Sequence, residues 1–168
     1  MNRQTYHELI DLRPISDDDL EFLCGVYADT RMEEMEQTGW TAEQILDFLQ
    51  FQFHLQHTQY MENFKGAQFD VILFNKEPAG RLYVHRQDHD IRIIDIALLR
   101  KFRRQGIGSK LMNDLMAEAD DKNTLLSLHV EYNNPALDLH ERLGFKKGDL
   151  KGVYYYMERP PTQKQEAA

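Results

Sequence analysis

The sequence predicts a mixed α/β fold: a twisted, mostly antiparallel sheet of about six or seven strands with helices on both faces. Three observations support this prediction. Apolar runs of strand length, separated by short turns, occupy residues 68–99. Apolar residues at helical spacing precede this region and recur at residues 107–119. The strand after that helix, residues 125–132, must run parallel to the strand before it, because a helix crossover joins the two.

The first 60 residues predict one strand and two helices. The expected elements are a strand over Tyr6–Leu12, a helix from Ser16 and a helix from Thr41 to about residue 59. Each helix starts with a capping box: Ser16 precedes Asp19 by three residues, in a variant of the motif. Thr41 stands in the same relation to Gln44. The polar segment in between, residues 30–40, has no clear preference.

An antiparallel meander is expected in the middle of the chain, because short polar turns separate consecutive apolar runs. Its predicted strands are residues 68–74, 80–86 and 91–99, with turns at 75–78 and 87–90. Towards the C-terminus, Asn134 suits an N-cap, Pro135 the first helical position and Gly144 the position after a helix end. A short helix is therefore predicted over residues 136–143. Closing strands are expected at residues 145–150 and 153–158.

Composition limits the function classes. A chain of 168 residues suits one domain, expected over residues 1–159, with a disordered tail at 160–168. The net charge of −8 argues against nucleic-acid binding. There is no apolar stretch of ~18 residues to span a membrane and no apolar signal-peptide core at the start. A single cysteine, Cys24, excludes an internal disulfide, so we expect a cytoplasmic protein.

The segment from Arg103 to Gly108 lies between an expected strand and an expected helix. Its two glycines, Gly106 and Gly108, allow the backbone to approach a ligand closely at the positive end of a helix dipole. Five cationic residues and no acidic one surround it: Arg100, Lys101, Arg103, Arg104 and Lys110. The pattern fits neither the dinucleotide fingerprint nor the P-loop. It predicts a site for a phosphate-rich ligand.

A second motif, Asn133-x-x-Ala136-x-x-x-His140-x-x-x-Gly144-Phe145, follows one strand and one helix later. Together with Arg103-x-x-Gly106-x-Gly108 and the order of elements, it resembles the GCN5-related N-acetyltransferase (GNAT) superfamily. The resemblance covers nearly the whole chain. It implies transfer of an acetyl group from acetyl-CoA, the acyl-donor cosubstrate, to an amine.

The resemblance also implies which residues bind acetyl-CoA. It implies that the backbone of one loop holds the pyrophosphate: Arg103, Arg104, Gln105, Gly106, Ile107, Gly108 and Ser109. It further implies that Leu98, Leu99 and Arg100 pair with the pantetheine arm, that the sheet splays beside them to admit the thioester, and that Asn133 contacts the cofactor. A backbone N–H of Leu98 or Leu99 is a candidate stabiliser of the oxyanion.

The sequence departs from the family at His140, where tyrosine is common as the general acid toward the departing sulfur. Imidazole can donate a proton, since its pKa lies near 6.5, but His140 can equally be a spectator that caps the helix side of the cleft. Possible substitutes are Tyr132, Tyr154, Tyr155 and Tyr156.

Asp95 lies in an apolar strand that leads to the glycine loop. A carboxylate there needs a partner. It is either a base that deprotonates the acceptor through water or one half of an ion pair with a structural cation.

Two other readings stay open. One is a catalytically silent acyl-CoA-binding sensor or interaction domain, which the departure at His140 keeps in view. The other is a phosphoryl-ligand enzyme of different chemistry. No metal site is expected, because the histidines lack a ligand framework. The acceptor, a small molecule or a peptide amine, and pairing into a homodimer are not determined by the sequence.

Overall fold

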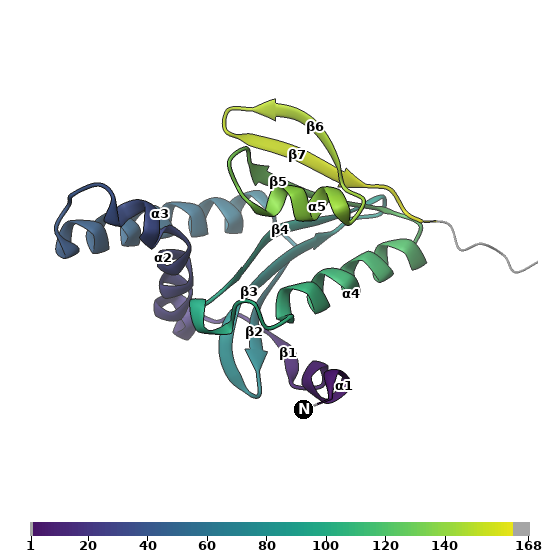
Figure 1. Cartoon of the computed structure of the whole chain (residues 1–168), viewed down its shortest axis with the longest axis horizontal. Helices are drawn as coiled ribbons and strands as arrows, with labels where there is room; N and C mark the ends of the chain where they lie inside the picture. The colour runs from purple at the N-terminus through teal and green to yellow at the C-terminus, as the bar shows by residue number, and fades with distance from the viewer. Residues whose placement is uncertain (1, 163–168) are drawn as a thin grey trace, which may run out of the picture. The chain divides into compact units, whose positions relative to one another are not determined.

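The computed structural model describes residues 2–162, which form a mixed α/β structure (Figure 1). The helices are α1 (Arg3–His7), η1 (Asp17–Asp19), α2 (Leu20–Glu36), α3 (Ala42–Asn63), η2 (Arg100–Phe102), α4 (Ile107–Asp121) and α5 (Ala136–Arg142). The strands are β1 (Ile10–Pro14), β2 (Gln68–Phe74), β3 (Glu77–Arg86), β4 (Asp90–Leu98), β5 (Leu125–Glu131), β6 (Lys146–Lys151) and β7 (Tyr154–Arg159). The strand order is β1-β2-β3-β4-β5-β7-β6. The predicted fold class is therefore confirmed.

The chain forms two compact units, and β3 and β4 run through both. The first unit comprises the residues up to Tyr83 together with Asp95–Gly108. The second comprises Val84–Ile94 and the residues from Ser109 onward. No helix in the described part of the chain combines the length and the hydropathy that a membrane span requires.

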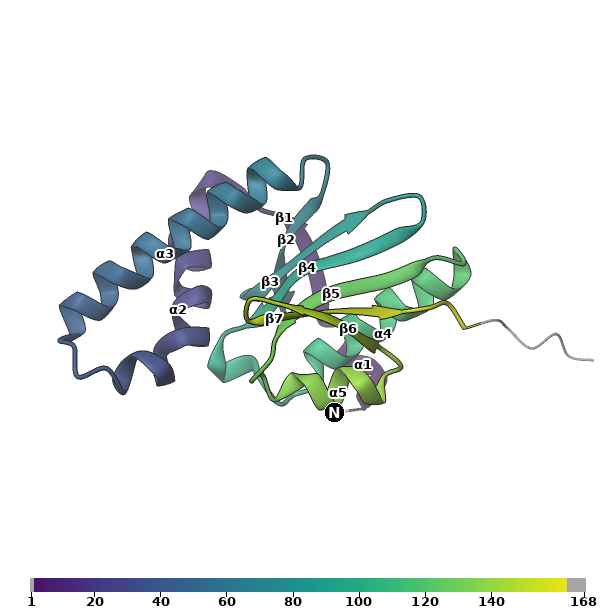
Figure 2. The same cartoon turned by 90° about the horizontal axis from the view of Figure 1, so that it is seen from above.

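A helical hairpin dominates the first unit, in which α2 and α3 lie side by side (Figure 2). Its buried contact consists of apolar residues at helical spacing: Leu23, Tyr27, Met35, Ile45, Leu49 and Phe53. Both predicted capping boxes are present, one at Ser16 and Asp19 and one at Thr41 and Gln44. Arg13 donates two hydrogen bonds of 2.8 Å to the Asp19 carboxylate, and this contact lowers the pKa of Asp19 to about 2.

The prediction of a first strand over Tyr6–Leu12 is wrong at its start. Residues 3–7 form α1, which Asn2 caps by accepting a hydrogen bond from the N–H of Gln4. The strand begins only at Ile10, where antiparallel pairing with β2 begins at Phe74. The ambiguous segment 30–40 continues α2 as far as Glu36. Pairing with β2 sets the start of β1, and a single-sequence pattern does not record such pairing.

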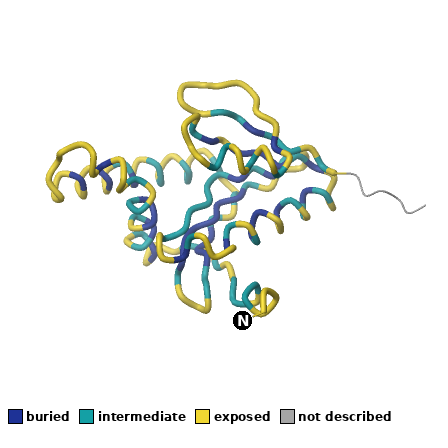
Figure 3. The backbone as a smooth tube through the Cα atoms, viewed as in Figure 1, coloured by how far each residue is buried: buried dark blue, intermediate teal, exposed yellow. Residues whose placement is uncertain are grey.

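In the second unit, β4 pairs with β5 in parallel, as predicted, from Asp90 with Leu125 to Ile93 with Leu128. The pairing ends there, although β4 continues to Leu98 and β5 to Glu131. β7 pairs antiparallel with β5 and with β6. Buried positions recur along one side of α4 (Figure 3), and they are Ile107, Leu111, Met112, Leu115 and Ala119.

The predicted disordered tail begins at residue 160. Its first part is held in place, because Thr162 donates hydrogen bonds from its N–H and its hydroxyl to the Asp120 carboxylate. Arg159 binds the same carboxylate at 2.9 Å. Residues 163–168 of the predicted tail lie outside the described residues.

Candidate functional site

The predicted site residues fall into both units. Asp95 and the residues from Leu98 to Gly108 belong to the first unit. Ser109, Asn133 and His140 belong to the second. The structure thus brings Asp95 together with the glycine loop in one compact unit.

The loop before α4 presents its backbone to open space. Arg104 and Gly106 have positive φ angles of 60° and 86°, which turn the chain sharply into the helix. The side chain of Ile107 is fully buried and anchors the first turn of α4. No atom lies within 4 Å of the position that a Cβ would occupy at Gly106 or Gly108. The N–H groups of the first helical turn have no intrahelical partners, so the loop presents the kind of donors that the predicted phosphate site needs.

Two residues whose backbone is expected to hold the pyrophosphate use their side chains to hold the loop itself. The Nε of Arg103 donates to the carbonyl oxygen of Leu98 at 2.9 Å. The Nε2 of Gln105 donates to the carbonyl oxygen of Lys101 at 2.7 Å, and its Oε1 accepts a hydrogen bond from the Tyr6 hydroxyl. These contacts fix the loop's shape, so any contribution of Arg103 and Gln105 to the ligand comes mainly from the backbone.

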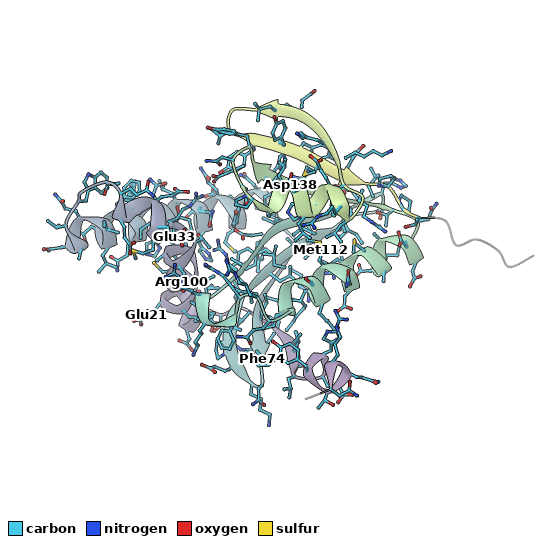
Figure 4. The ribbon with its side chains drawn as sticks, in the orientation of Figure 1. Glu21, Glu33, Phe74, Arg100, Met112 and Asp138 are labelled. Atoms are coloured by element: carbon cyan, nitrogen blue, oxygen red, sulfur yellow. The ribbon has the colours of Figure 1, made fainter. Side chains whose placement is uncertain are left out.

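Most of the positive charge of the loop is paired. Arg100 forms an ion pair with Glu33 at 2.9 Å (Figure 4), and its N–H donates to the Asp29 carboxylate. The other paired cations are Lys101 with Glu77 at 2.6 Å and Lys110 with Asp114. Within residues 2–162, Arg104 has no hydrogen-bonding or ion-pair partner, and it is exposed. Arg104 is therefore the cation of the loop that can bind an anionic ligand without breaking another contact.

The end of β4 is fixed against β3. The N–H of Leu99 donates to the carbonyl oxygen of Ala79 at 2.8 Å. At the other end of the strand pair, the N–H of Gln87 donates to the carbonyl oxygen of Asp90. Between these two bonds β4 contains one residue more than β3, so β4 carries a β-bulge. Because the N–H of Leu99 is occupied, Leu98 is the better of the two candidate oxyanion donors.

Asp95 pairs with a cation, which is one of the two roles that its sequence position allowed. Its Oδ2 accepts hydrogen bonds from Arg81 at 2.8 Å and from the Tyr60 hydroxyl at 3.0 Å. The Arg81 side chain is 3% exposed and also donates to Gln56 of α3 at 2.9 Å. The cluster joins α3, β3 and β4. Sequence reasoning missed Arg81, although two charges in apolar strands of one meander are a signal for such a pair.

In the second unit, Asn133 lies exposed in the turn after β5. The next residue, Asn134, accepts a hydrogen bond from the N–H of Ala136 at 2.9 Å, but the N-cap of α5 is Pro135, so the predicted N-cap is one residue early. Ser109 is exposed in the first turn of α4. These positions leave both Ser109 and Asn133 accessible to a ligand.

His140 is half-buried on α5, with its ring centroid 5.7 Å from that of Phe145. Its Nδ1 is buried and has no hydrogen-bonding partner within the described residues. Burial lowers the pKa of His140, so the neutral imidazole is favoured near pH 7. This environment supports the spectator role more than the acid role. Among the tyrosines considered as substitutes, Tyr132 is exposed, and Tyr156 donates its hydroxyl hydrogen to Glu158.

The described part of the chain contains no group of three His, Cys, Asp or Glu side chains placed to hold a metal ion. The first unit offers backbone N–H groups and Arg104 for contact with an anion.

Comparison with known proteins agrees with this geometry. Residues 29–145 match the model of the Acetyltransferase (GNAT) family. An N-alpha-acetyltransferase of Saccharolobus solfataricus is 35% identical over 78 residues, which cover 40% of this chain and 47% of the relative. N-alpha-acetyltransferase 50 of Danio rerio is 29% identical over 103 residues, covering 56% and 61%. The chain thus spans about half the length of the curated relatives that it matches.

The fold also has solved counterparts. The PaiA N-acetyltransferase of Thermoplasma acidophilum, in complex with coenzyme A, superposes with a TM-score of 0.64 at 18% identity, covering 90% of this chain and 98% of that one. At this identity the likeness concerns the fold. The family model, which matches well over half of the chain, shows that the chain belongs to the Acetyltransferase (GNAT) family.

Proposed function

We propose that this chain transfers an acetyl group from acetyl-CoA to a primary amine. The observation that carries the proposal is the loop before α4, whose backbone is open at Gly106 and Gly108 and whose Arg104 has no competing partner within residues 2–162. A diphosphate fits these donors in both charge and hydrogen bonding. Family membership supports acetyl-CoA as the donor.

In this proposal the N–H groups from Arg104 to Ser109 bind the pyrophosphate. The backbone of Leu98, Leu99 and Arg100 lies along the pantetheine, and the exposed Asn133 contacts the donor. The Arg100 side chain is paired with Glu33 and the backbone N–H of Arg100 donates to the Asp29 carboxylate, so in this proposal its contribution comes from van der Waals contact.

The reaction needs few side chains. A neutral amine attacks the thioester carbonyl, a C–N bond forms, and the C–S bond breaks. The N–H of Leu98 stabilises the oxyanion, and water takes the proton that the amine nitrogen loses. The departing thiolate takes a proton from water or a tyrosine. We assign Asp95 a positioning role through Arg81 and Tyr60, because its Oδ2 already accepts two hydrogen bonds. We assign His140 the spectator role.

Only the names of the relatives narrow the range of acceptor amines to test. Both relatives described above are N-alpha-acetyltransferases, so peptides with a free α-amino group are the first acceptors to test, followed by small primary amines. We expect the protein to act in the cytoplasm. Whether it forms a homodimer can be tested by light scattering.

Two measurements test the proposal. Calorimetry should detect binding of acetyl-CoA and not of ATP or NAD, and Gly108→Ala should weaken it. That position has an open Cβ site and no positive φ, so the substitution should not destabilise the helix. If folded protein gives no heat with acetyl-CoA, the proposal is wrong.

The second candidate function is a silent acyl-CoA-binding domain, which the family model and the N-alpha-acetyltransferase relatives do not favour. Thiol release from acetyl-CoA in the presence of peptides and small amines separates the two functions. Binding without thiol release from any amine would support the silent domain.

A further inference from the structure

We propose that Gly80 is a positioning residue for acetyl transfer, because the absence of a side chain there lets the end of β4 direct the N–H of Leu98 toward the thioester carbonyl. The inference rests on the donor site proposed above and deepens it. Gly80 lies in β3, is buried, and is not part of the glycine loop.

The backbone of β4 occupies the space that a side chain at Gly80 would need. A Cβ there would overlap the carbonyl oxygen of Ala97 and lie 2.9 Å from the Cα of Leu98. Both are main-chain atoms, so neither can be relieved by a side-chain rotation. Of the nine glycines in the chain, all within the described residues, Gly80 alone shows a Cβ contact of 3.0 Å or less. The requirement for glycine at this position is therefore steric.

The close approach of Gly80 to the backbone of β4 determines where the N–H of Leu98 points. The carbonyl oxygen of Ala97 is the atom nearest to the Cβ position at Gly80, so that carbonyl is directed toward β3. In a trans peptide the N–H lies opposite the C=O, and the described chain contains no cis peptide bond. The N–H of Leu98 consequently points away from β3. By contrast, the N–H of Leu99 donates to Ala79 on β3.

The peptide on the other side of Leu98 is also fixed. Its carbonyl oxygen accepts a hydrogen bond from Arg103 Nε at 2.9 Å. Two contacts thus fix the backbone of Leu98: the hydrogen bond from Arg103 in the loop, and the close approach of Gly80 in β3. Parallel pairing of β4 with β5 ends at Ile93, five residues before the end of β4 at Leu98. The N–H of Leu98 therefore lies beyond the paired part of that strand edge.

The test compares two ligands that differ by the group that Leu98 would bind. Acetyl-CoA carries the thioester carbonyl and coenzyme A does not, so the ratio of their dissociation constants reports this hydrogen bond. A hydrogen bond between neutral groups corresponds to about fivefold in affinity. Calorimetry should show that Gly80→Ala loses about fivefold preference for acetyl-CoA while its affinity for coenzyme A stays within about threefold.

Gly25→Ala is the matched control. Gly25 lies in α2 with no atom within 4 Å of its Cβ position, so the same added methyl group should leave the preference unchanged. Folded Gly80→Ala with the wild-type preference would overturn the inference. An equal loss of affinity for both ligands would also overturn it, because that pattern indicates general damage.

Should Gly80→Ala fail to fold, a second variant carries the test. Replacing Leu98 by its α-hydroxy analogue removes the N–H while Gly80 stays intact. The expected result is the same loss of preference, and an unchanged preference contradicts the inference. Wild-type protein that binds neither ligand would instead disprove the donor site itself.

Discussion

The segments 95–108 and 133–145 were predicted as the two parts of one site, and the structure builds them in opposite ways. In the first segment the charged side chains are paired, and the backbone around Gly106 is open. In the second, the backbone turn at Gly144 is closed by hydrogen bonds, and His140 has a buried nitrogen without a partner in the described chain.

The two glycines illustrate the difference. Gly106 and Gly144 have similar positive φ angles of 86° and 99°. Gly106 introduces α4 and leaves N–H groups available, whereas the N–H of Gly144 bonds to Glu141 at the end of α5. The same backbone conformation therefore creates a binding surface at a helix start and completes a cap at a helix end. In the function proposed above, ligand recognition depends on free main-chain donors more than on the number of cationic residues.

The largest expected effect comes from Asp95→Asn. Arg81 would keep its buried charge without its partner, which costs about 3 kcal/mol of unfolding free energy. Asp114→Asn removes an exposed pair with Lys110 and should cost no more than about 0.5 kcal/mol. Urea unfolding measures both variants. The dependence of kcat/KM on pH should keep its shape in Asp95→Asn. A sharp loss at neutral pH that recovers at high pH would make Asp95 the base.

Gly106→Ala and Gly144→Ala should destabilise the fold to a similar extent, about 1–2 kcal/mol each, because both place a Cβ at positive φ. Only Gly106→Ala should weaken the binding of coenzyme A. The Cβ at Gly144 would meet ordinary contacts, the nearest being Arg159 Nε at 3.8 Å. Thermal unfolding and calorimetry on both variants check this. If both variants lost the same affinity for coenzyme A, the proposed difference between the two turns would be wrong.

Arg104→Ala should reduce the affinity for coenzyme A about tenfold, because a hydrogen bond to a charged group contributes about 1.5 kcal/mol or more. Arg100→Ala should change it by less than about twofold, since Arg100 is already paired with Glu33. Titrating both variants with coenzyme A at low and at high salt distinguishes the two effects. High salt should screen the attraction between Arg104 and the ligand, so the effect of Arg104→Ala should shrink. A larger effect at Arg100 would show that the ion pair opens for the ligand.

His140→Phe is expected to have the smallest effect on catalysis, with kcat within about twofold of wild type. Its visible effect should be on the pH dependence of stability. Burial lowers the pKa of His140 below its ordinary value of 6.5, so its contribution is present above about pH 6.5 and is lost as the pH falls through the lowered pKa. Urea midpoints at pH 7.5 and 5 should therefore differ less in His140→Phe. A large fall in kcat would restore His140 as the acid.

Local signals in the sequence predicted most of the fold. The capping boxes at Ser16 and Thr41 were found because each depends on residues three apart. The parallel pair β4 and β5 followed from the helix between them. The late start of β1 was missed because it depends on pairing with β2, about 64 residues away along the chain.

The candidate site was predictable in its backbone and less so in its side chains. The loop was located by its two glycines, whose conformational demand is local. Partners of the charged residues come from distant segments: Glu33 and Glu77 pair with Arg100 and Lys101. A count of charges along the sequence records none of these pairs, so it overstated the positive charge of the loop.

The hydrogen bond from Tyr6 to Gln105 ties the glycine loop to the helix at the beginning of the chain. Removal of that helix would free the loop to sample other shapes, and part of the binding energy would then be spent on reordering it.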